Sequence, residues 1–212
     1  MDAEVFRAWI VSAAGVIEAN RDHLTQLDAA IGDADHGVNL ARGFTAVLGA
    51  LEAGSARVAT PGAVLTVTGN TLISKVGGAS GPLYGVAFRR AGKALGDAAD
   101  VDLPSLSAAL DAALAGVQQL GAAREGDKTM VDALAAATRA FSKAIAEGAS
   151  PDDALRSLAE AAQAGATATI SMQALKGRAS YLGPRSVGHE DPGAVSTALI
   201  LGALRDAARA GR

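Results

Sequence analysis

The sequence contains no cysteine, so neither a disulfide bond nor a thiolate metal site contributes to the fold. Aromatic residues make up only 3% of the chain, although hydrophobic residues as a whole make up 50%. The core must therefore consist mainly of alanine, leucine, valine and isoleucine. Because such small side chains let helices approach closely, the composition predicts an all-α bundle.

An excess of charge of one sign is also absent, since 19 lysines and arginines stand against 22 acidic residues and the net charge is -3. The chain thus has no general attraction for nucleic acid or for an anionic membrane, and we expect neither partner. No apolar run approaches the ~18 residues of a membrane helix, and the N-terminus carries acids where a signal peptide carries bases. We expect a soluble, cytoplasmic protein whose residues 1–212 form a single domain.

Apolar residues recur with helical spacing, and no alternating β pattern of useful length is present. About eight helices are indicated, most of them opened by Ser, Thr, Asp or Pro and closed by Gly. The segment of residues 176–190 lacks periodicity and carries several glycines, which predicts a long and functional loop. The expected helices cover residues 3–20, 24–30, 36–51, 60–76, 82–95, 105–120, 127–147, 151–175 and the chain from 191 onward.

The sharpest local feature is a group of three carboxylates, Asp28, Asp33 and Asp35, at a helix–loop–helix junction. Hard oxygen ligands at a bend suit Mg²⁺ or Ca²⁺. Taken alone, Asp33 and Asp35 would more often be turn and N-cap residues, and Asp28 a solvated helix residue. An EF-hand starting at Asp33 would need glycine and glutamate where Val38 and Phe44 stand, so a calcium sensor is disfavoured.

Two glycine-marked junctions, at residues 77–81 and 191–193, lie before expected helices, whose N-termini can bind anions. Each alone is more often an ordinary connection. The Walker A and G-x-G-x-x-G patterns are absent, which excludes P-loop and dinucleotide folds. At another helix start Asp127 is expected to cap and Lys128 to be solvated, although Lys128 could also neutralise phosphate. Arg178, in the long loop, could be solvated or could face phosphate.

Four segments in order, LDAAIGDADHGVNLARG, GGASGPLYG, GDKTMVDAL and SYLGPRSVGHEDPGAVS, closely resemble the ADP-binding L subunits of phosphoenolpyruvate-dependent dihydroxyacetone kinases, over essentially the whole chain. The resemblance implies an all-α barrel of eight antiparallel amphipathic helices with a nucleotide across one end. It also implies that Asp28, Asp33 and Asp35 coordinate two Mg²⁺ ions against the phosphates of ADP or ATP. The catalysis implied is metal-assisted transfer, with no catalytic side chain assigned.

The resemblance extends to the nucleotide pocket. The implied nucleotide contacts are His36 and Asn39 at the phosphate end, Ala79 and Ser80 in the glycine-rich turn, Gly121 and Met130 around the base, and Arg178, Asp191, Pro192 and Gly193. One departure is Ala34, where the family usually has glycine. If this position needs a positive φ, alanine costs roughly 1 kcal/mol of strain.

The function implied is a relay. Bound ADP accepts a phosphoryl group from a phosphocarrier subunit and passes it to dihydroxyacetone on a separate substrate subunit. Two alternatives stay open. One is the nucleotide domain of a related kinase for another ketose or a fatty acid, although the fatty acid kinases typically have threonine in place of His36. The other is a nucleotide-loaded regulatory module that acts through protein contact.

Overall fold

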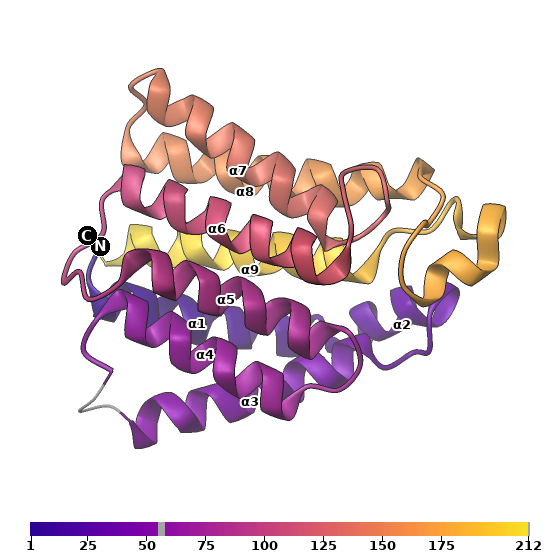
Figure 1. Cartoon of the computed structure of the whole chain (residues 1–212), viewed down its shortest axis with the longest axis horizontal. Helices are drawn as coiled ribbons and strands as arrows, with labels where there is room; N and C mark the ends of the chain where they lie inside the picture. The colour runs from indigo at the N-terminus through magenta and orange to yellow at the C-terminus, as the bar shows by residue number, and fades with distance from the viewer. Residues whose placement is uncertain (55–57, 212) are drawn as a thin grey trace.

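The computed structural model describes residues 1–54 and 58–211, and in these ranges the chain forms helices and no strand (Figure 1). This confirms the all-α class. The helices are α1 (Ala3–Ala19), α2 (Arg21–Ile31), α3 (His36–Ala53), α4 (Pro61–Lys75), α5 (Ser80–Leu95), α6 (Leu103–Gly121), α7 (Met130–Ala146), α8 (Pro151–Ala168), the 3₁₀ helices η2 (Thr169–Ser171) and η3 (Arg178–Ser186), and α9 (Pro192–Ala210).

The long helices form a closed ring. From α3 to α9 each helix packs against the next one along the chain, while α1 packs against both α3 and α9. From α3 to α9 successive helices run in opposite directions, and the connections that follow α2, α4, α6 and α8 gather at one end of the molecule (Figure 1). Segments distant in sequence therefore meet at this end.

Four of the seven aromatic residues form one cluster in the core. Ring centroids are 5.8 Å apart for Phe6 and Trp9, 5.7 Å for Trp9 and Phe88, and 6.4 Å for Phe44 and Phe88. The indole N–H of buried Trp9 donates to the carbonyl of Ile200 at 2.8 Å, so its polar atom is satisfied. These contacts join α1, α3, α5 and α9 across the ring.

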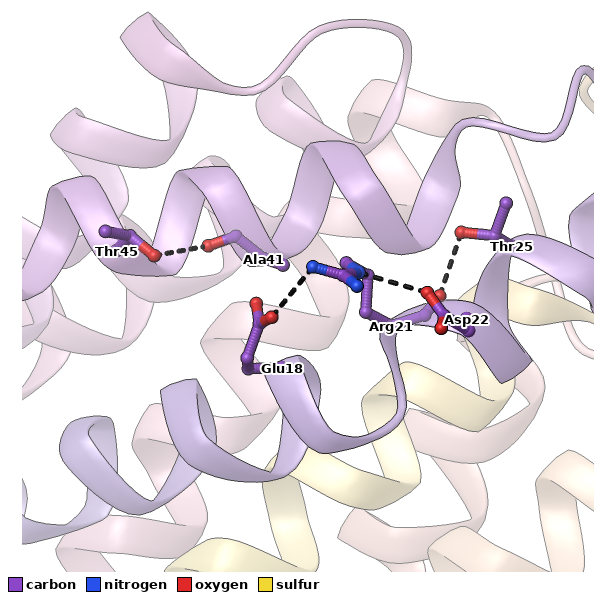
Figure 2. Close-up of polar contacts among 6 residues, drawn as sticks. All are labelled: Glu18, Arg21, Asp22, Thr25, Ala41 and Thr45. Carbon is purple, nitrogen blue, oxygen red and sulfur yellow. Dashed lines mark hydrogen bonds and ion pairs between the residues drawn. The ribbon is translucent and has the colours of Figure 1, made fainter.

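The short helix α2 is held at the end of the ring by its approach to α3. At its first turn Arg21 lies 2.9 Å from Glu18 and 3.1 Å from Asp22, as Figure 2 shows, although such exposed pairs contribute little stability. The decisive contact is steric. A Cβ at Gly37 would lie 2.0 Å from the carbonyl oxygen of Arg21 and 2.6 Å from Oγ1 of Thr25, so only glycine lets α2 lie against the start of α3.

Two expectations for residues 151–190 are wrong. The helix expected over residues 151–175 ends at Ala168 and is followed by the 3₁₀ turn η2, after which the backbone at Met172 is extended. The side chain of Thr169 contacts the start of α9, since its Oγ1 accepts from the amide of Asp191 at 2.9 Å. The segment 176–190, expected to be a loop, contains η3. The non-periodic sequence signalled irregular backbone correctly, but short 3₁₀ turns have no apolar repeat by which they could be read.

The helix expected from Asp127 begins instead at Met130, and its cap is Thr129 rather than Asp127. Thr129 accepts from the amide of Val131 at 3.1 Å, and the carboxylate of Asp132 accepts from the amide of Thr129 at 2.8 Å. This reciprocal capping box satisfies more of the free amides of the first turn than Asp127 could.

Both termini lie at the end of the molecule opposite the α2–α3 junction (Figure 1). They are adjacent, because a Cβ placed on Gly211 would lie 2.9 Å from a methyl group of Val5. In the described ranges, no helix combines the length and the hydropathy that crossing a membrane requires.

Candidate functional site

Three carboxylates converge where α2 passes into α3. Asp28, Asp33 and Asp35 each offer one oxygen that lies within 4.8 Å of the other two, and this is the one such group among the described residues. Asp28 is buried, whereas Asp33 and Asp35 are exposed. Converging carboxylate oxygens are the ligand set that Mg²⁺ and Ca²⁺ prefer, so the residues present fit a divalent cation.

The burial of Asp28 has a second role. Its Oδ2 accepts from the amides of Asp35 at 2.9 Å and His36 at 3.1 Å, so α3 is capped by a residue of the preceding helix. Asp35 occupies the N-cap position, but its side chain makes no capping bond. A Cβ at Gly32 would lie 2.0 Å from Oδ1 of Asp28, so glycine is required there to admit the carboxylate. The alternative view of Asp28 as solvated and Asp35 as a side-chain cap is therefore wrong.

The loop between these carboxylates is strained. Ala34 has a φ of 63°, so the positive φ under which alanine was expected to be strained at this position is present. In the described part of the chain the other non-glycine residues with positive φ are Ala122, at 46°, and Lys128, at 60°. Both lie in or beside the α6–α7 connection at the same end of the molecule. Such conformations cost on the order of 1 kcal/mol each and persist where the surroundings hold them.

His36 is part of a buried hydrogen-bond chain rather than a free side chain. Its Nδ1 lies 3.0 Å from Oγ of Ser80, and its Nε2 lies 2.8 Å from Oγ of Ser196. Ser196 in turn lies 2.6 Å from the hydroxyl of Tyr84, which also lies 2.9 Å from Oγ1 of Thr197. The chain of polar groups thus joins the first turns of α3, α5 and α9.

Burial determines the protonation states of the histidine and the tyrosine in this hydrogen-bond chain. It lowers the pKa of His36, although Asp28 and Asp35 oppose the shift, so the neutral imidazole is favoured. Burial likewise raises the pKa of the Tyr84 hydroxyl, which stays protonated and able to donate. Neutral partners on both ring nitrogens fix the orientation of the imidazole.

A cavity of about 290 Å³ opens beside the carboxylates, bounded by the four connections gathered at this end. Its lining includes the three aspartates and residues at the starts of α5, α7 and α9, and the positive dipole ends of these helices favour an anion. Apolar side chains, among them Leu83, Val117 and Val131, also line it. The sequence-predicted residues that line it are Asp28, Asp33, Asp35, His36, Ala79, Ser80, Gly121, Met130, Arg178, Asp191, Pro192 and Gly193.

Asn39 is the sequence-predicted residue that does not line this cavity. It is buried one turn into α3, and its Oδ1 accepts from the guanidinium of Arg42 at 2.8 Å. Its amide nitrogen faces the α4–α5 turn, since a Cβ on Gly77 would lie 3.8 Å from Nδ2. Its expected contact with phosphate stays a prediction.

Arg178 and Asp191 reach the cavity from the chain between α8 and α9. Nε of Arg178 lies 2.9 Å from Oδ2 of Asp33. Asp191 is the N-cap of α9, and its Oδ2 accepts from the amide of Ala194 at 2.7 Å. Burial raises the pKa of the Asp191 carboxyl to about 7, against the lowering influence of that amide and of Lys128.

Lys128 and Tyr84 are two of the cavity residues that the sequence did not predict. Lys128 was expected to be solvated, but it is only 1% exposed and lines the cavity, so that expectation is wrong. Tyr84 lies within the quoted segment GGASGPLYG but was assigned no role. A tyrosine two residues after a Gly-Pro helix start carried no signal of its own, because its partners lie on α9.

Comparison with known proteins accords with this geometry. The sequence profile of the DAK2 domain family matches residues 30–206. The ADP-binding subunit DhaL of the PEP-dependent dihydroxyacetone kinase of Escherichia coli is 40% identical over 201 residues, which cover 95% of each chain. The human triokinase/FMN cyclase is 39% identical over 183 residues, which cover 86% of this chain and 31% of that protein.

The fold is also found in a solved structure. The dihydroxyacetone kinase of C. freundii, in complex with AMP-PNP and Mg²⁺, superimposes with a TM-score of 0.69 and 30% identity over 94% of this chain. This chain spans about a third of that kinase's length, since the match covers 33% of it. The match to the family profile takes in the greater part of the chain, and a relative of similar length shares two residues in five with it, so the chain belongs to the DAK2 domain family, alongside the DhaL subunits.

Proposed function

We propose that this chain is the ADP-binding subunit of a dihydroxyacetone kinase, and that its residues 1–212 act as one domain in the cytoplasm. In this function ADP stays bound, accepts a phosphoryl group from a phosphocarrier subunit, and passes it to dihydroxyacetone on a separate substrate subunit. The observation that carries the proposal is the convergence of Asp28, Asp33 and Asp35 in the lining of the cavity. The match with a DhaL subunit, which covers 95% of both chains, supports it.

In the proposed complex the aspartates hold two Mg²⁺ ions against the nucleotide phosphates. The metal ions would supply charge neutralisation as the phosphoryl group moves. The protein residues would bind and orient the nucleotide. The first turns of α5 and α9 offer amides to phosphate oxygens at Ala79, Ser80 and Gly193, and Asp28 keeps the start of α3 in place through its two backbone bonds.

The apolar residues that line the cavity suit the adenine ring. Leu83, Val117 and Met130 present aliphatic surface, and Gly121 leaves room beside Leu83, whose methyl group would lie 3.3 Å from a Cβ there. Arg178 covers the phosphate side from η3. A planar guanidinium can meet two oxygens at once, so we propose that Arg178 binds phosphate when nucleotide is present.

We further propose that the phosphoryl group is carried by the nucleotide and not by a side chain. His36 is the one histidine at the cavity, and both of its ring nitrogens are engaged by serine hydroxyls within the ring of helices. A nitrogen that is to accept phosphorus must first give up such a bond. The carboxylates and the helix starts instead suit in-place transfer to and from bound ADP.

A single-chain, ATP-dependent kinase is the second candidate. Triokinase/FMN cyclase and the C. freundii kinase each contain a domain similar to this chain in about a third of their length. In such enzymes the nucleotide must exchange with free ATP at each turnover. A fatty acid kinase domain is less favoured because His36 stands where that family typically has threonine, and a purely regulatory module has no observation in its favour.

Nucleotide exchange during turnover separates the two candidates. The protein is loaded with radiolabelled ADP, freed of excess nucleotide, and mixed with phosphoenolpyruvate, the phosphocarrier proteins, the substrate subunit and dihydroxyacetone. We expect dihydroxyacetone phosphate to form while the label stays with the protein through gel filtration. Product formed from ATP without the phosphocarrier, with rapid loss of label, would overturn the proposal and favour the single-chain type.

A further inference from the structure

Lys128 is an unusual residue to find inside the protein. Its side chain is 1% exposed, and its backbone adopts a left-handed conformation with a φ of 60°. Burial lowers the pKa of its ammonium group, whereas Asp191, Glu190 and Asp132 raise it. No carboxylate of the described residues forms an ion pair with it, so what holds the lysine in place must be its other contacts.

Those contacts are two main-chain carbonyls. The ammonium donates to the carbonyl oxygens of Thr169 and His189, which are 41 and 61 residues further along the chain. Thr169 begins the connection between α8 and α9, and His189 stands close to its end. One side chain thus joins the two ends of the segment of residues 169–190, which we call the Arg178 loop.

Hydrogen bonds between uncharged groups also join the two ends of the Arg178 loop, near the ammonium of Lys128. We call this closed base of the loop its neck. The amide of Gly188 donates to the carbonyl of Ile170 at 2.8 Å, and the amide of Asp191 donates to Oγ1 of Thr169 at 2.9 Å. The amide of Leu175 donates to the carbonyl of Asp127, the residue before the lysine, at 3.1 Å. The neck therefore rests on the backbone at residues 127 and 128.

The far part of the loop reaches the carboxylate cluster, since η3 contacts α2 and Arg178 pairs with Asp33. The position of Arg178 is thus set by its own ion pair, which is exposed and weak, and by the neck. From this arrangement we propose that Lys128 is a positioning residue, which closes the neck of the Arg178 loop and thereby places Arg178 at the cavity.

A lysine suits this role better than its substitutes. Its three donors radiate from one atom and can meet carbonyls on different segments, whereas the donors of arginine lie in one plane. Methionine fills similar space but leaves both carbonyls without a donor in a buried place. Lys128→Met therefore removes the closure of the neck, and Lys128→Arg keeps the charge without the geometry.

The first experiment measures the stability of the hydrogen bonds in the neck. Hydrogen exchange is measured at the amides of Gly188 and Asp191 in the nucleotide-free protein and in Lys128→Met. We expect exchange at both to rise at least ~10-fold while amides in the middle of α9 keep their rates. The control is Lys143→Met, because Lys143 lies on α7 with 74% of its side chain exposed and its ammonium pairs with the exposed Glu147. Unchanged exchange at the neck would overturn the proposal.

A double-mutant cycle tests whether Lys128 acts through Arg178. This arm rests on the proposed function, because it uses Mg²⁺-ADP as its probe in calorimetry. We expect Lys128→Met and Arg178→Ala each to weaken binding about tenfold, and the double variant to lose little more than either. Losses that multiply would overturn the link. If the unaltered protein does not bind Mg²⁺-ADP, the proposed function fails while the exchange result still decides the role of the neck.

Lys128→Met could unfold the protein, so a further measurement uses the unaltered chain. Under native conditions the lysines are methylated with formaldehyde and borohydride, and the extent at each is read by peptide mass spectrometry. We expect Lys143 and Lys176 to react at least ~10-fold faster than Lys128, whose ammonium is held by two carbonyls. Equal rates at Lys128 and Lys176 would show an open neck and contradict the proposal.

Discussion

Nε of Arg178 lies 2.9 Å from Oδ2 of Asp33, so the guanidinium of the loop neutralises one of the three clustered carboxylates. The two side chains are 70% and 39% exposed, and such a pair contributes at most ~1 kcal/mol. A divalent cation on Asp33 competes with Arg178 for that carboxylate. Phosphate oxygens are then the natural new partner for the guanidinium.

Arg178→Lys is expected to weaken Mg²⁺-ADP binding about tenfold, or ~1.4 kcal/mol, because an ammonium cannot meet two oxygens in one plane. Calorimetry measures the affinity. Arg185→Lys is the matched control, because Arg185 lies on the same 3₁₀ segment but does not line the cavity. Equal affinity in the Arg178 variant and the unaltered protein would leave the loop without its proposed contact.

Asp35→Asn is expected to weaken Mg²⁺-ADP binding at least about tenfold without a change in stability, because this carboxylate makes no capping bond and is exposed. Calorimetry gives the affinity, and urea unfolding gives the stability. Asp33→Asn should behave alike, apart from loss of its pair with Arg178. Binding equal to the unaltered protein in both variants would make these residues turn residues only.

Asp28→Ala should differ from both, since it removes a metal ligand and the cap of α3 together. We expect the free energy of unfolding to fall by about 1–2 kcal/mol in metal-free buffer, because the amides of Asp35 and His36 lose their acceptor. Urea unfolding with EDTA present measures this separately from metal binding. A stability equal to that of Asp35→Asn would rule out the capping role.

Ala34→Gly is expected to stabilise the protein by ~0.5–1 kcal/mol, because glycine has no Cβ and adopts a φ of 63° without the strain that the Cβ of alanine causes. Urea unfolding measures the gain. The control, Ala8→Gly, lies at an exposed position within α1 and should lose about 1 kcal/mol. If both substitutions destabilise equally, the strain at Ala34 is absent.

Asp191 predicts a dependence of stability on pH. The folded protein raises the pKa of this carboxyl to about 7 by burial, so it binds the proton more tightly than the unfolded chain. The resulting stabilisation is complete below the unfolded pKa of about 3.9 and is lost as the pH rises through the folded value. Between about pH 4 and pH 8, Asp191→Asn should therefore gain at least ~1 kcal/mol relative to the unaltered protein.

The measurement is urea unfolding across this range without metal or nucleotide. Asparagine can still accept the amide of Ala194 but does not titrate, so the difference between the two proteins isolates Asp191. The opposite trend from His36, whose lowered pKa makes stability fall toward acid, is common to both proteins and cancels. Parallel stability profiles would contradict the raised pKa.

The sequence predicted those parts of the site whose residues lie close together along the chain. Asp28, Asp33 and Asp35 are close in sequence, and a bend between two helices is enough to bring them together. The capping box of Thr129 and Asp132 was also readable, because the acid stands three residues after the threonine. Asp127 was chosen instead because both residue types can cap, and only the box decides between them.

Contacts between distant segments could not be read in this way. A lysine before a helix has the same local sequence whether it is solvated or buried, and the carbonyls that hold Lys128 belong to another connection. The hydroxyls that hold His36 likewise come from Ser80 and Ser196, which lie 44 and 160 residues away. Such partners follow from closure of the helical ring, for which one sequence without an alignment carries no direct signal.

The adjacent termini at the far end of the ring limit how this domain can be joined to another. The helices that separate them from the cavity have up to 19 residues, which corresponds to about 28 Å. A linker from either terminus must span that length before an attached domain can reach the cavity mouth. Such a linker needs roughly nine extended residues or more. Shorter linkers leave the mouth unobstructed, so a purification tag or an immobilising surface attached there keeps the pocket accessible.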